Sequence, residues 1–347
     1  MVAMLVGAWV TVAIGLVVCV VVAAGLFVGS PPPVLRAVRV SRLALSAAVR
    51  VWGFGYRAYD GSHRHAYVVL PAWYGPGHDP IVPLVIAPHG RGVGPHANVR
   101  LWGDLPAVGS FALVSPEGEG LYSWGAPGQI SDLAGMPRLL RRAMPWLRVD
   151  PHRVYAVGGS MGGQETLLLV AEHPHLLAGA AAFDSVADFG YQYGQFPFLR
   201  CDRRCLRVWR EPVGLALQDI ARKEIGGTPA SDPYGYALRS PLTYARRIAL
   251  SRVPLELWWS RNDLIVRNQQ EQSGELFRQI KQINPQAAIE GFVGSWAHTA
   301  EMRSTTSLPF ALEQLGLLPA RFDRRPPRAD YLAPSTSWPP LARWTVD

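Results

Sequence analysis

The sequence predicts an α/β fold in which helices cover a doubly wound, mostly parallel β-sheet. Short, nearly all-apolar runs recur along the chain, as in strands that are buried on both faces of a parallel sheet. Segments with apolar residues at helical spacing separate these runs. The chain has 347 residues, of which 49% are hydrophobic and 17% charged, so it holds enough apolar material for one large core.

The chain begins with a long apolar segment. Residues 2–29 include no charged side chain, and a helix of that length crosses about 30 Å of hydrocarbon. Residues 1–30 are therefore predicted to be a transmembrane anchor or an uncleaved signal, since secretory signals usually have a basic start and a shorter apolar stretch. Val22, Ala23 and Ala24 form a weak cleavage site, and cleavage there would release a secreted protein.

Residues 31–51 are predicted to be a basic linker or helix. A helix over 34–51 would place four arginines on one face, suited to an anionic membrane surface or to docking on the body. These are Arg36, Arg39, Arg42 and Arg50. By the positive-inside rule, they would keep this flank in the cytoplasm.

Two cysteines, Cys201 and Cys205, lie outside the leader. Their spacing suits a local disulfide, which needs an oxidising compartment, or two free thiols. A disulfide favours a single-pass membrane protein with an extracytoplasmic domain. Two cysteines cannot form a four-cysteine zinc site. Although the net charge is +8, the sequence has no run of basic residues with interleaved aromatics of the kind that binds nucleic acid. No metal, cofactor or nucleic-acid partner is predicted.

The elements of the body follow in order. A leading hairpin is predicted from strands at 52–59 and 66–70, joined by a turn containing Asp60 and Gly61. Ser131 is predicted to cap a helix in which apolar residues recur at helical spacing. Further strands are predicted at 81–87, 111–114, 154–157, 178–183, 255–259 and 288–293, and helices at 131–147, after Ser160 and at 269–283.

Two regions depart from this alternation. Residues 188–250 are too long for an ordinary connection and are predicted to be a lid or cap insertion within a domain that spans 52–318. Residues 319–347 form a Pro-rich C-terminal tail, which is expected to run extended over the body.

Ser160 stands in a G-x-S-x-G motif where a predicted strand enters a helix. In this setting the serine occupies a sharp, strained turn, and side chains at Gly158 or Gly162 would collide with neighbouring elements. The helix N-terminus directs its free N–H groups at a reacting carbonyl, so the Met161 N–H is a predicted oxyanion donor. Ser160 is the predicted nucleophile.

A second oxyanion donor is expected from the loop after the strand at 81–87. Residues 88–92 (PHGRG) occupy that place, so the N–H of Gly90 or Arg91 is the candidate. His89 is expected to pack and hydrogen-bond beneath the loop rather than to act as a base.

A serine hydroxyl needs a histidine base, and that histidine needs a carboxylate to orient it. His298 is the only histidine late in the chain, and Asp263 follows the strand at 255–259. The order Ser, Asp, His agrees with the fold that carries this motif. Asp184, after the strand at 178–183, competes with Asp263 for the role of the acid.

Several motifs support a family resemblance. They are His89-Gly90, Trp124, DPHRVY at 150–155, GGSMGG at 158–163, SPLTY at 240–244, DLIV at 263–266, and His298. With them, residues 52–315 resemble the catalytic domain of prolyl-oligopeptidase-like and polyhydroxybutyrate-depolymerase-like esterases of the α/β-hydrolase superfamily. The resemblance implies a metal-free serine esterase or peptidase. Fewer than sixty residues precede the hairpin and they hold no propeller that would screen peptides, which favours esters.

The predicted activity is hydrolysis of a small-molecule or lipid-like carboxylic ester through an acyl-enzyme on Ser160, with His298 as base and Asp263 as its partner. Two alternatives remain open: a serine peptidase of the prolyl-oligopeptidase type, and a membrane-anchored binding protein that keeps the fold without turnover. Aromatic residues could line an acyl pocket. The candidates are Trp102, Tyr122, Trp124, Tyr191, Tyr193, Phe196 and Phe198.

Overall fold

The computed structural model describes residues 36–43, 45–199, 213–303, 305–319 and 329–332. The predicted leader at 1–30 and the pair Cys201 and Cys205 lie outside these ranges. Within them, no helix is both long and apolar enough to cross a membrane.

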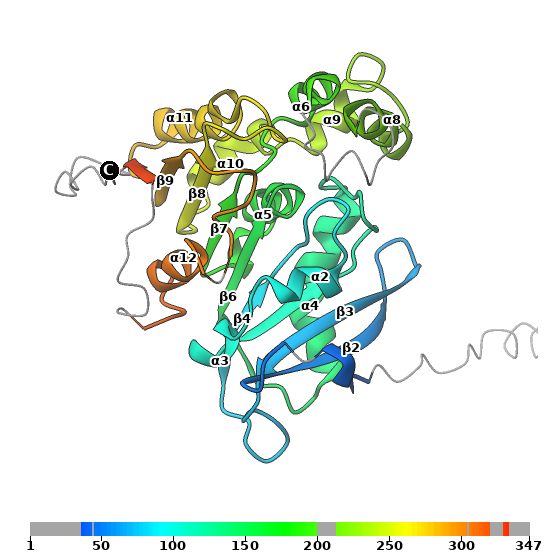
Figure 1. Cartoon of the computed structure of the whole chain (residues 1–347), viewed down its shortest axis with the longest axis vertical. Helices are drawn as coiled ribbons and strands as arrows, with labels where there is room; N and C mark the ends of the chain where they lie inside the picture. Colours follow the sequence, from blue (N-terminus) through cyan, green and yellow to red (C-terminus); the bar gives the residue numbers. More distant parts are fainter. Residues whose placement is uncertain (1–35, 44, 200–212, 304, 320–328, 333–347) are drawn as a thin grey trace, which may run out of the picture. The chain divides into compact units, whose positions relative to one another are not determined.

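In the described ranges, ten strands form one sheet in the order β1-β2-β3-β5-β4-β6-β7-β8-β9-β10 (Figure 1). The strands are β1 Val38–Arg39, β2 Val49–Arg57, β3 His63–Pro71, β4 Val82–Ile86, β5 Ala112–Pro116, β6 Val149–Gly159, β7 Gly179–Phe183, β8 Leu255–Ser260, β9 Ile289–Gly294 and β10 Ala329–Leu332. From β5 to β9 along that order, all neighbouring pairs are parallel. Strands β1, β2 and β3 at one edge and β10 at the other are antiparallel. The predicted sheet and its leading hairpin, β2 and β3, are confirmed.

Helices cover both faces of the sheet. Successive side chains of a strand point to opposite faces, and β8 shows this with two neighbouring tryptophans. Trp258 packs against Phe292 and Phe310, whereas Trp259 packs against Phe277 on the other face. The first face carries α2 Pro95–Arg100, α3 Leu105–Val108 and α12 Leu308–Gln314, and the second carries α4 Pro127–Ala143, α5 Met161–Glu172, α10 Ala245–Leu250 and α11 Ser273–Ile283. Short 3-10 turns are η1 Ser41–Leu43, η2 Pro174–Leu176 and η5 Gln269–Glu271.

The basic segment is not a helix. In place of the helix expected over 34–51, the chain forms β1, η1 and the start of β2. Val49 and Val51 are buried on either side of exposed Arg50, which is the two-residue period of a strand. The four arginines therefore do not share a helical face.

The predicted cap of α4 was also wrong. The helix begins at Pro127 rather than at Ser131. Proline is favoured in the first turn because backbone N–H groups there have no acceptor within the helix, so the absence of one costs nothing. The Ser131 hydroxyl lies inside the helix and donates a hydrogen bond to the Pro127 carbonyl at 3.1 Å. The core-facing stripe is as expected, because Leu133, Met136 and Leu140 are buried.

The described parts of the region 188–250, which are 188–199 and 213–250, fold mainly into helices beyond one end of the sheet, where Figure 1 shows α6, α8 and α9 together. Its elements are α6 Phe189–Gln195, η3 Phe196–Phe198, α8 Val213–Ile225, α9 Pro233–Leu238 and η4 Pro241–Tyr244, followed by α10. A second apolar cluster joins this insertion to the body, since Phe189, Leu217 and Tyr236 pack with Trp124 and Met161. Helix α10 packs on α5 and α11, so it belongs to the sheet-covering layer.

Part of the C-terminal tail extends the sheet. Residues 329–332 form β10, which pairs antiparallel with β9 and places Ala329 opposite Gly294. This pairing covers the edge that β9 would otherwise expose. The rest of the tail beyond residue 319 lies outside the described ranges.

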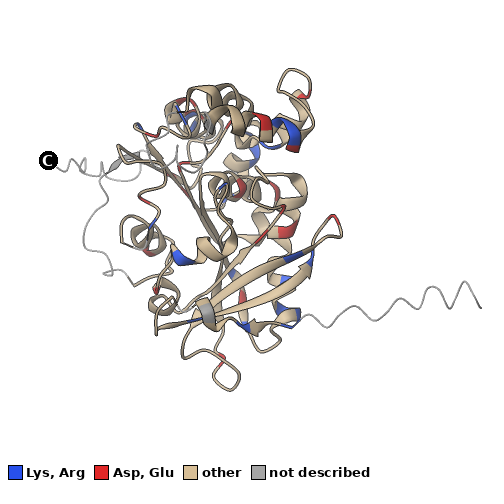
Figure 2. Cartoon of the chain, turned by 45° about the vertical axis from the view of Figure 1, so that its right-hand side comes forward, with Lys and Arg blue, Asp and Glu red and all other residues tan. Residues whose placement is uncertain are grey.

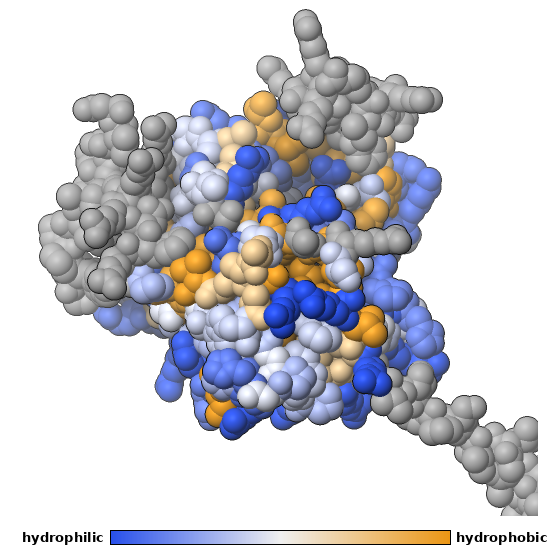
Figure 3. All heavy atoms as spheres, turned by 60° about the horizontal axis from the view of Figure 1, so that its bottom comes forward, coloured by the Kyte–Doolittle hydropathy of each residue, from blue (hydrophilic) through white to orange (hydrophobic). Residues whose placement is uncertain are grey.

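The surface mixes charges and apolar groups. Figure 2 shows basic and acidic residues interspersed along several elements, and Figure 3 shows apolar side chains between hydrophilic ones on the face that it presents. Large exposed apolar side chains include Tyr59, Trp73 and Ile81. Exposed apolar residues that occur singly are ordinary for a globular protein.

Candidate active site

Ser160 occupies a strained turn between β6 and α5. Its φ of 59° and ψ of −125° lie where side chains are rarely found. A Cβ added at Gly158 would lie 2.4 Å from the Gly162 carbonyl oxygen, and one at Gly162 would lie 2.4 Å from the Pro88 carbonyl oxygen. Both glycines are therefore required by space, as the motif predicted, and the turn presents Ser160 at the carboxyl end of the sheet.

His298 and Asp263 form a hydrogen-bonded pair. His298 Nδ1 lies 2.7 Å from Asp263 Oδ2. Because a carboxylate only accepts hydrogen bonds, Nδ1 carries a proton and Nε2 of the neutral ring is left as an acceptor. Asp263 is itself fixed, since its Oδ1 accepts from the backbone N–H groups of Ile265 and Val266 at 2.8 and 3.0 Å.

The pair sets the charge on the imidazole. Burial alone would lower the pKa of His298, but the negative charge of Asp263 and its hydrogen bond outweigh burial and raise the pKa above its ordinary value. The Asp263 side chain is fully buried, while 17% of the His298 side chain is exposed. His298 is therefore partly accessible from the surface of the site, while Asp263 lies behind it.

Asp184, the competing acid, has a different set of partners. Its Oδ1 accepts a hydrogen bond from Ser260 N at 2.9 Å, and its Oδ2 accepts from Trp296 Nε1 at 2.9 Å and Thr299 N at 2.6 Å. Burial and the charge of Asp263 raise the pKa of Asp184 above its ordinary value. The hydrogen bonds thus place Asp263, and not Asp184, on the ring of His298.

The loop after β4 comes close to Ser160. A Cβ added at Gly90 would lie 4.0 Å from the Ser160 Cβ, so the Gly90 and Arg91 backbone approaches the nucleophile as an oxyanion donor must. His89 is buried, and its ring nitrogens lie 3.0 Å from the Gly90 oxygen and 2.9 Å from the Glu117 oxygen. Those contacts agree with the predicted packing role of His89 beneath the loop.

Met161 is the first residue of α5, directly after Ser160. Its side chain packs into the apolar cluster that holds the insertion on the body. The backbone N–H of a first helical residue has no partner within its helix and is available to a ligand. The structure therefore places Met161, Gly90 and Arg91 around the serine, and their oxyanion role stays a prediction.

Ser160 and His298 line the same cavity of about 170 Å³. Gly90 and Arg91 form part of its wall, together with Thr299 and Arg303. The remaining wall is mostly apolar and includes Val93, Leu101 and Met302. The nucleophile, the base and the oxyanion candidates therefore face one enclosed space.

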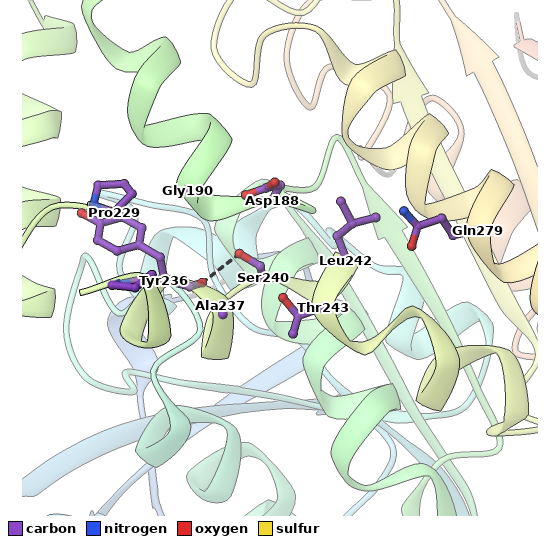
Figure 4. A pocket seen from close by; sticks show the side chains of 10 residues that line it. Asp188, Gly190, Pro229, Tyr236, Ala237, Ser240, Leu242, Thr243 and Gln279 are labelled. Atoms are coloured by element: carbon purple, nitrogen blue, oxygen red, sulfur yellow. Dashed lines mark hydrogen bonds between the residues drawn. The ribbon is translucent and has the colours of Figure 1, made fainter. Parts of the chain in front are cut away.

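A larger cavity, of about 380 Å³, lies between α6, α9, η4 and α11 (Figure 4). Its serine, Ser240, donates to the Tyr236 carbonyl at 2.8 Å and accepts from Phe189 N at 2.9 Å. These bonds use the hydroxyl to join α9 to α6. Despite its size, this cavity has no serine beside a histidine among the residues that line it, whereas Ser160 and His298 share the smaller cavity.

None of the seven aromatic candidates for an acyl pocket lines the Ser160 cavity. Trp102 is fully buried in the core beneath the sheet. Trp124 packs at a tilt against Phe189 and Phe196 in the cluster that attaches the insertion. These aromatic side chains hold elements together.

A buried polar group beneath the site was not predicted. Glu165, on α5, accepts hydrogen bonds from the Ser123 hydroxyl and, at 3.0 Å, from Gln129 Nε2. Burial raises the pKa of Glu165. Only its position among the apolar residues of α5 could have marked it as buried, and the sequence alone does not reveal its partners.

The chain is similar to known hydrolases, although no known protein-family profile matches it. A stretch of 113 residues is 34% identical to a putative esterase, NocK, of Nocardia uniformis subsp. tsuyamanensis. That stretch covers 29% of this chain and 32% of the relative, so the match spans about a third of that protein.

Solved structures show the fold over most of the chain. An acylaminoacyl peptidase of Pyrococcus horikoshii has a TM-score of 0.54 and 17% identity, over 74% of this chain and 39% of its own. A thermostable esterase of Pseudomonas putida has a TM-score of 0.56 and 16% identity, over 78% and 82%. The Pyrococcus furiosus esterase Pf2001 has a TM-score of 0.51 and 17% identity, over 78% and 90%. These likenesses show the α/β-hydrolase fold.

Proposed function

We propose that this α/β-hydrolase-fold protein is a serine hydrolase that cleaves carboxylic esters. The observation that carries the proposal is the 2.7 Å pair between His298 Nδ1 and Asp263 Oδ2, with the free side of the imidazole in the cavity that Ser160 lines. This pair supplies what a serine hydroxyl lacks, a neutral and oriented base.

The proposed reaction has two stages. His298 Nε2 takes the proton of the Ser160 hydroxyl while Oγ forms a bond to the ester carbonyl carbon, and the carbonyl electron pair moves onto oxygen. Collapse of this intermediate breaks the bond to the leaving oxygen, which receives the proton from His298 and departs as an alcohol. Water then repeats the sequence on the acyl-enzyme and releases the carboxylic acid.

Fixed dipoles would stabilise the oxyanion. The 12-residue helix α5 begins at Met161, and Gly90 and Arg91 line the same cavity as the serine. Such donors need no reorganisation as charge develops, and each contributes about 2.7–4 kcal/mol in comparable enzymes. We propose the N–H of Met161 and that of Gly90 or Arg91 as the donors.

Esters are the proposed substrates because the curated relative is named a putative esterase. The acylaminoacyl peptidase has the same fold, so peptide anilides belong in the same assay as nitrophenyl esters. Faster cleavage of anilides than of esters would replace this proposal with a peptidase.

We also propose that residues 1–30 anchor the protein as a single pass, with the hydrolase domain outside the cytoplasm. The support for the anchor is the uncharged apolar run at 2–29. The support for the orientation is the spacing of Cys201 and Cys205, which suits a local disulfide and hence an oxidising compartment. Full-length protein should stay with membranes after extraction at alkaline pH, and protease added outside intact cells should cleave the domain. Release from membranes at alkaline pH would contradict the anchor.

A fluorophosphonate probe, which labels activated serines, tests the central proposal. The wild-type protein and a Ser131→Ala control, changed at an exposed serine on α4, should be labelled, and Ser160→Ala should not. Labelling that persists in Ser160→Ala would move the nucleophile elsewhere. Absence of labelling in folded wild-type protein would favour a binding protein without turnover.

A further inference from the structure

The cavity at Ser160 has walls of one charge sign. Among the described residues that line it, Arg91 and Arg303 carry positive charges and none carries a carboxylate. The carboxylate hydrogen-bonded to His298 is that of Asp263, and this side chain is fully buried behind the imidazole. The charged side chains among these lining residues are therefore basic.

The two arginines approach from different elements. Arg91 follows β4 in the loop at the nucleophile, and Arg303 follows His298 in the segment after β9. Arg91 is partly buried, while Arg303 is exposed at the rim. Burial lowers the pKa of Arg91, because the charged guanidinium is poorly solvated there. A negative charge in the cavity would add an attractive interaction with this guanidinium.

The rest of the cavity wall would face the part of a substrate that lies between its charged group and its ester carbon. Val93, Leu101 and Met302 provide apolar surface in the wall of this cavity of about 170 Å³. The lining thus suits a short apolar segment with an anionic end.

We propose that the substrate is a small ester bearing a carboxylate, which the guanidinium groups of Arg91 and Arg303 bind beside Ser160. This inference rests on the proposed esterase function and adds a substrate class to it. Arginine suits the role because its planar N–H groups match the two oxygens of a carboxylate. The carboxylate belongs either to the acyl part or to the leaving alcohol.

Matched ester pairs distinguish these two sources. The acyl pair is mono-4-nitrophenyl adipate and 4-nitrophenyl hexanoate, which differ by the terminal carboxylate. The leaving-group pair is 4-acetoxybenzoate and its methyl ester. The expected result is a kcat/KM at least tenfold higher for the charged member of one pair, after correction for intrinsic reactivity, because hydrogen bonds to charged groups have this magnitude. The preference should shrink as salt rises.

Single substitutions assign the preference to the two side chains. Arg91→Gln and Arg303→Gln should each lower the ratio of charged to neutral kcat/KM several-fold, with the larger effect at the more buried Arg91. Both keep the backbone N–H groups. Arg100→Gln is the control, because it removes the same charge from the exposed end of α2, outside the cavity wall. An equal fall in Arg100→Gln would assign the effect to net charge and overturn the proposal.

Binding to Ser160→Ala gives a readout that needs no turnover. Adipic acid monoamide should bind more tightly than hexanamide by calorimetry, and adding Arg91→Gln should abolish the difference. Equal binding of both amides, with equal kinetics for both ester pairs, overturns the anion site even if Ser160-dependent esterase activity is found. Selective binding of the charged amide without Ser160-dependent hydrolysis of any ester would instead support the anion site and refute the esterase.

Discussion

The carboxylate of Asp184 accepts a hydrogen bond from the backbone N–H of Thr299 at 2.6 Å, one residue after His298. The same carboxylate oxygen accepts from the Trp296 indole two residues before His298. The other oxygen holds Ser260 N at the end of β8. Asp184 therefore joins the end of β7 to the segment that carries the base, and we assign it as a positioning residue.

Asp184→Asn should lower kcat and also move the pH profile. An amide has only one acceptor oxygen, so its NH2 group would face at least one N–H that the carboxylate now satisfies. The negative charge of Asp184 also raises the pKa of His298. Its removal should therefore shift the rising limb of kcat/KM against pH to lower pH. A fall in kcat without a shift of this rising limb would show that Asp184 has only a structural role.

Asp263→Asn should be more damaging than Asp184→Asn. Asp263 accepts the hydrogen bond from His298 Nδ1, and an asparagine there favours the wrong tautomer of the ring. In a comparable triad this substitution lowers kcat about 10⁴-fold. Steady-state kinetics of both variants on one good ester ranks the two acids. A larger loss in Asp184→Asn would make Asp184 the acid of the triad.

The rate on a good ester should rise with pH, with a midpoint above 6.5. Only neutral His298 accepts the Ser160 proton, and the charge of Asp263 raises the pKa of His298 above its ordinary value despite burial. The base is thus protonated and inactive at low pH and becomes active as pH rises through the raised pKa. The measurement is kcat/KM between about pH 5 and 9. A flat profile across that range would exclude His298 as the base.

Gly162→Ala should destabilise the fold, whereas Gly135→Ala should not. A methyl group at Gly162 would lie 2.4 Å from the Pro88 carbonyl oxygen, which belongs to the backbone and cannot easily move. We expect a loss of about 1–3 kcal/mol in the free energy of unfolding, typical of overpacking. Gly135, inside α4, has open space around it, and alanine there should add up to about 1 kcal/mol. Urea denaturation measures the free energy of unfolding of both variants. Equal changes in the two would show that steric crowding does not require glycine at position 162.

Local patterns predicted the strands of the sheet well, because a strand that is buried on both faces consists of consecutive apolar residues. The run at 81–87 contains β4 and the run at 178–183 contains β7. The same reasoning misread 34–51, where arginines at helical spacing suggested one face. There the buried pair Val49 and Val51 shows that strand packing decided the local structure.

The sequence by itself determined the α/β class, the turn at Ser160 and the candidates Asp263 and His298, because each depends on a short stretch of chain and its chemistry. Only the tertiary structure decided between Asp184 and Asp263. Both acids follow parallel strands, so both reach the same edge of the sheet, and a carboxylate oxygen of each lies within 4.8 Å of a His298 ring nitrogen. Which of them accepts the proton of Nδ1 depends on how three loops pack together. Such contacts join residues far apart in the chain, and no local pattern records them.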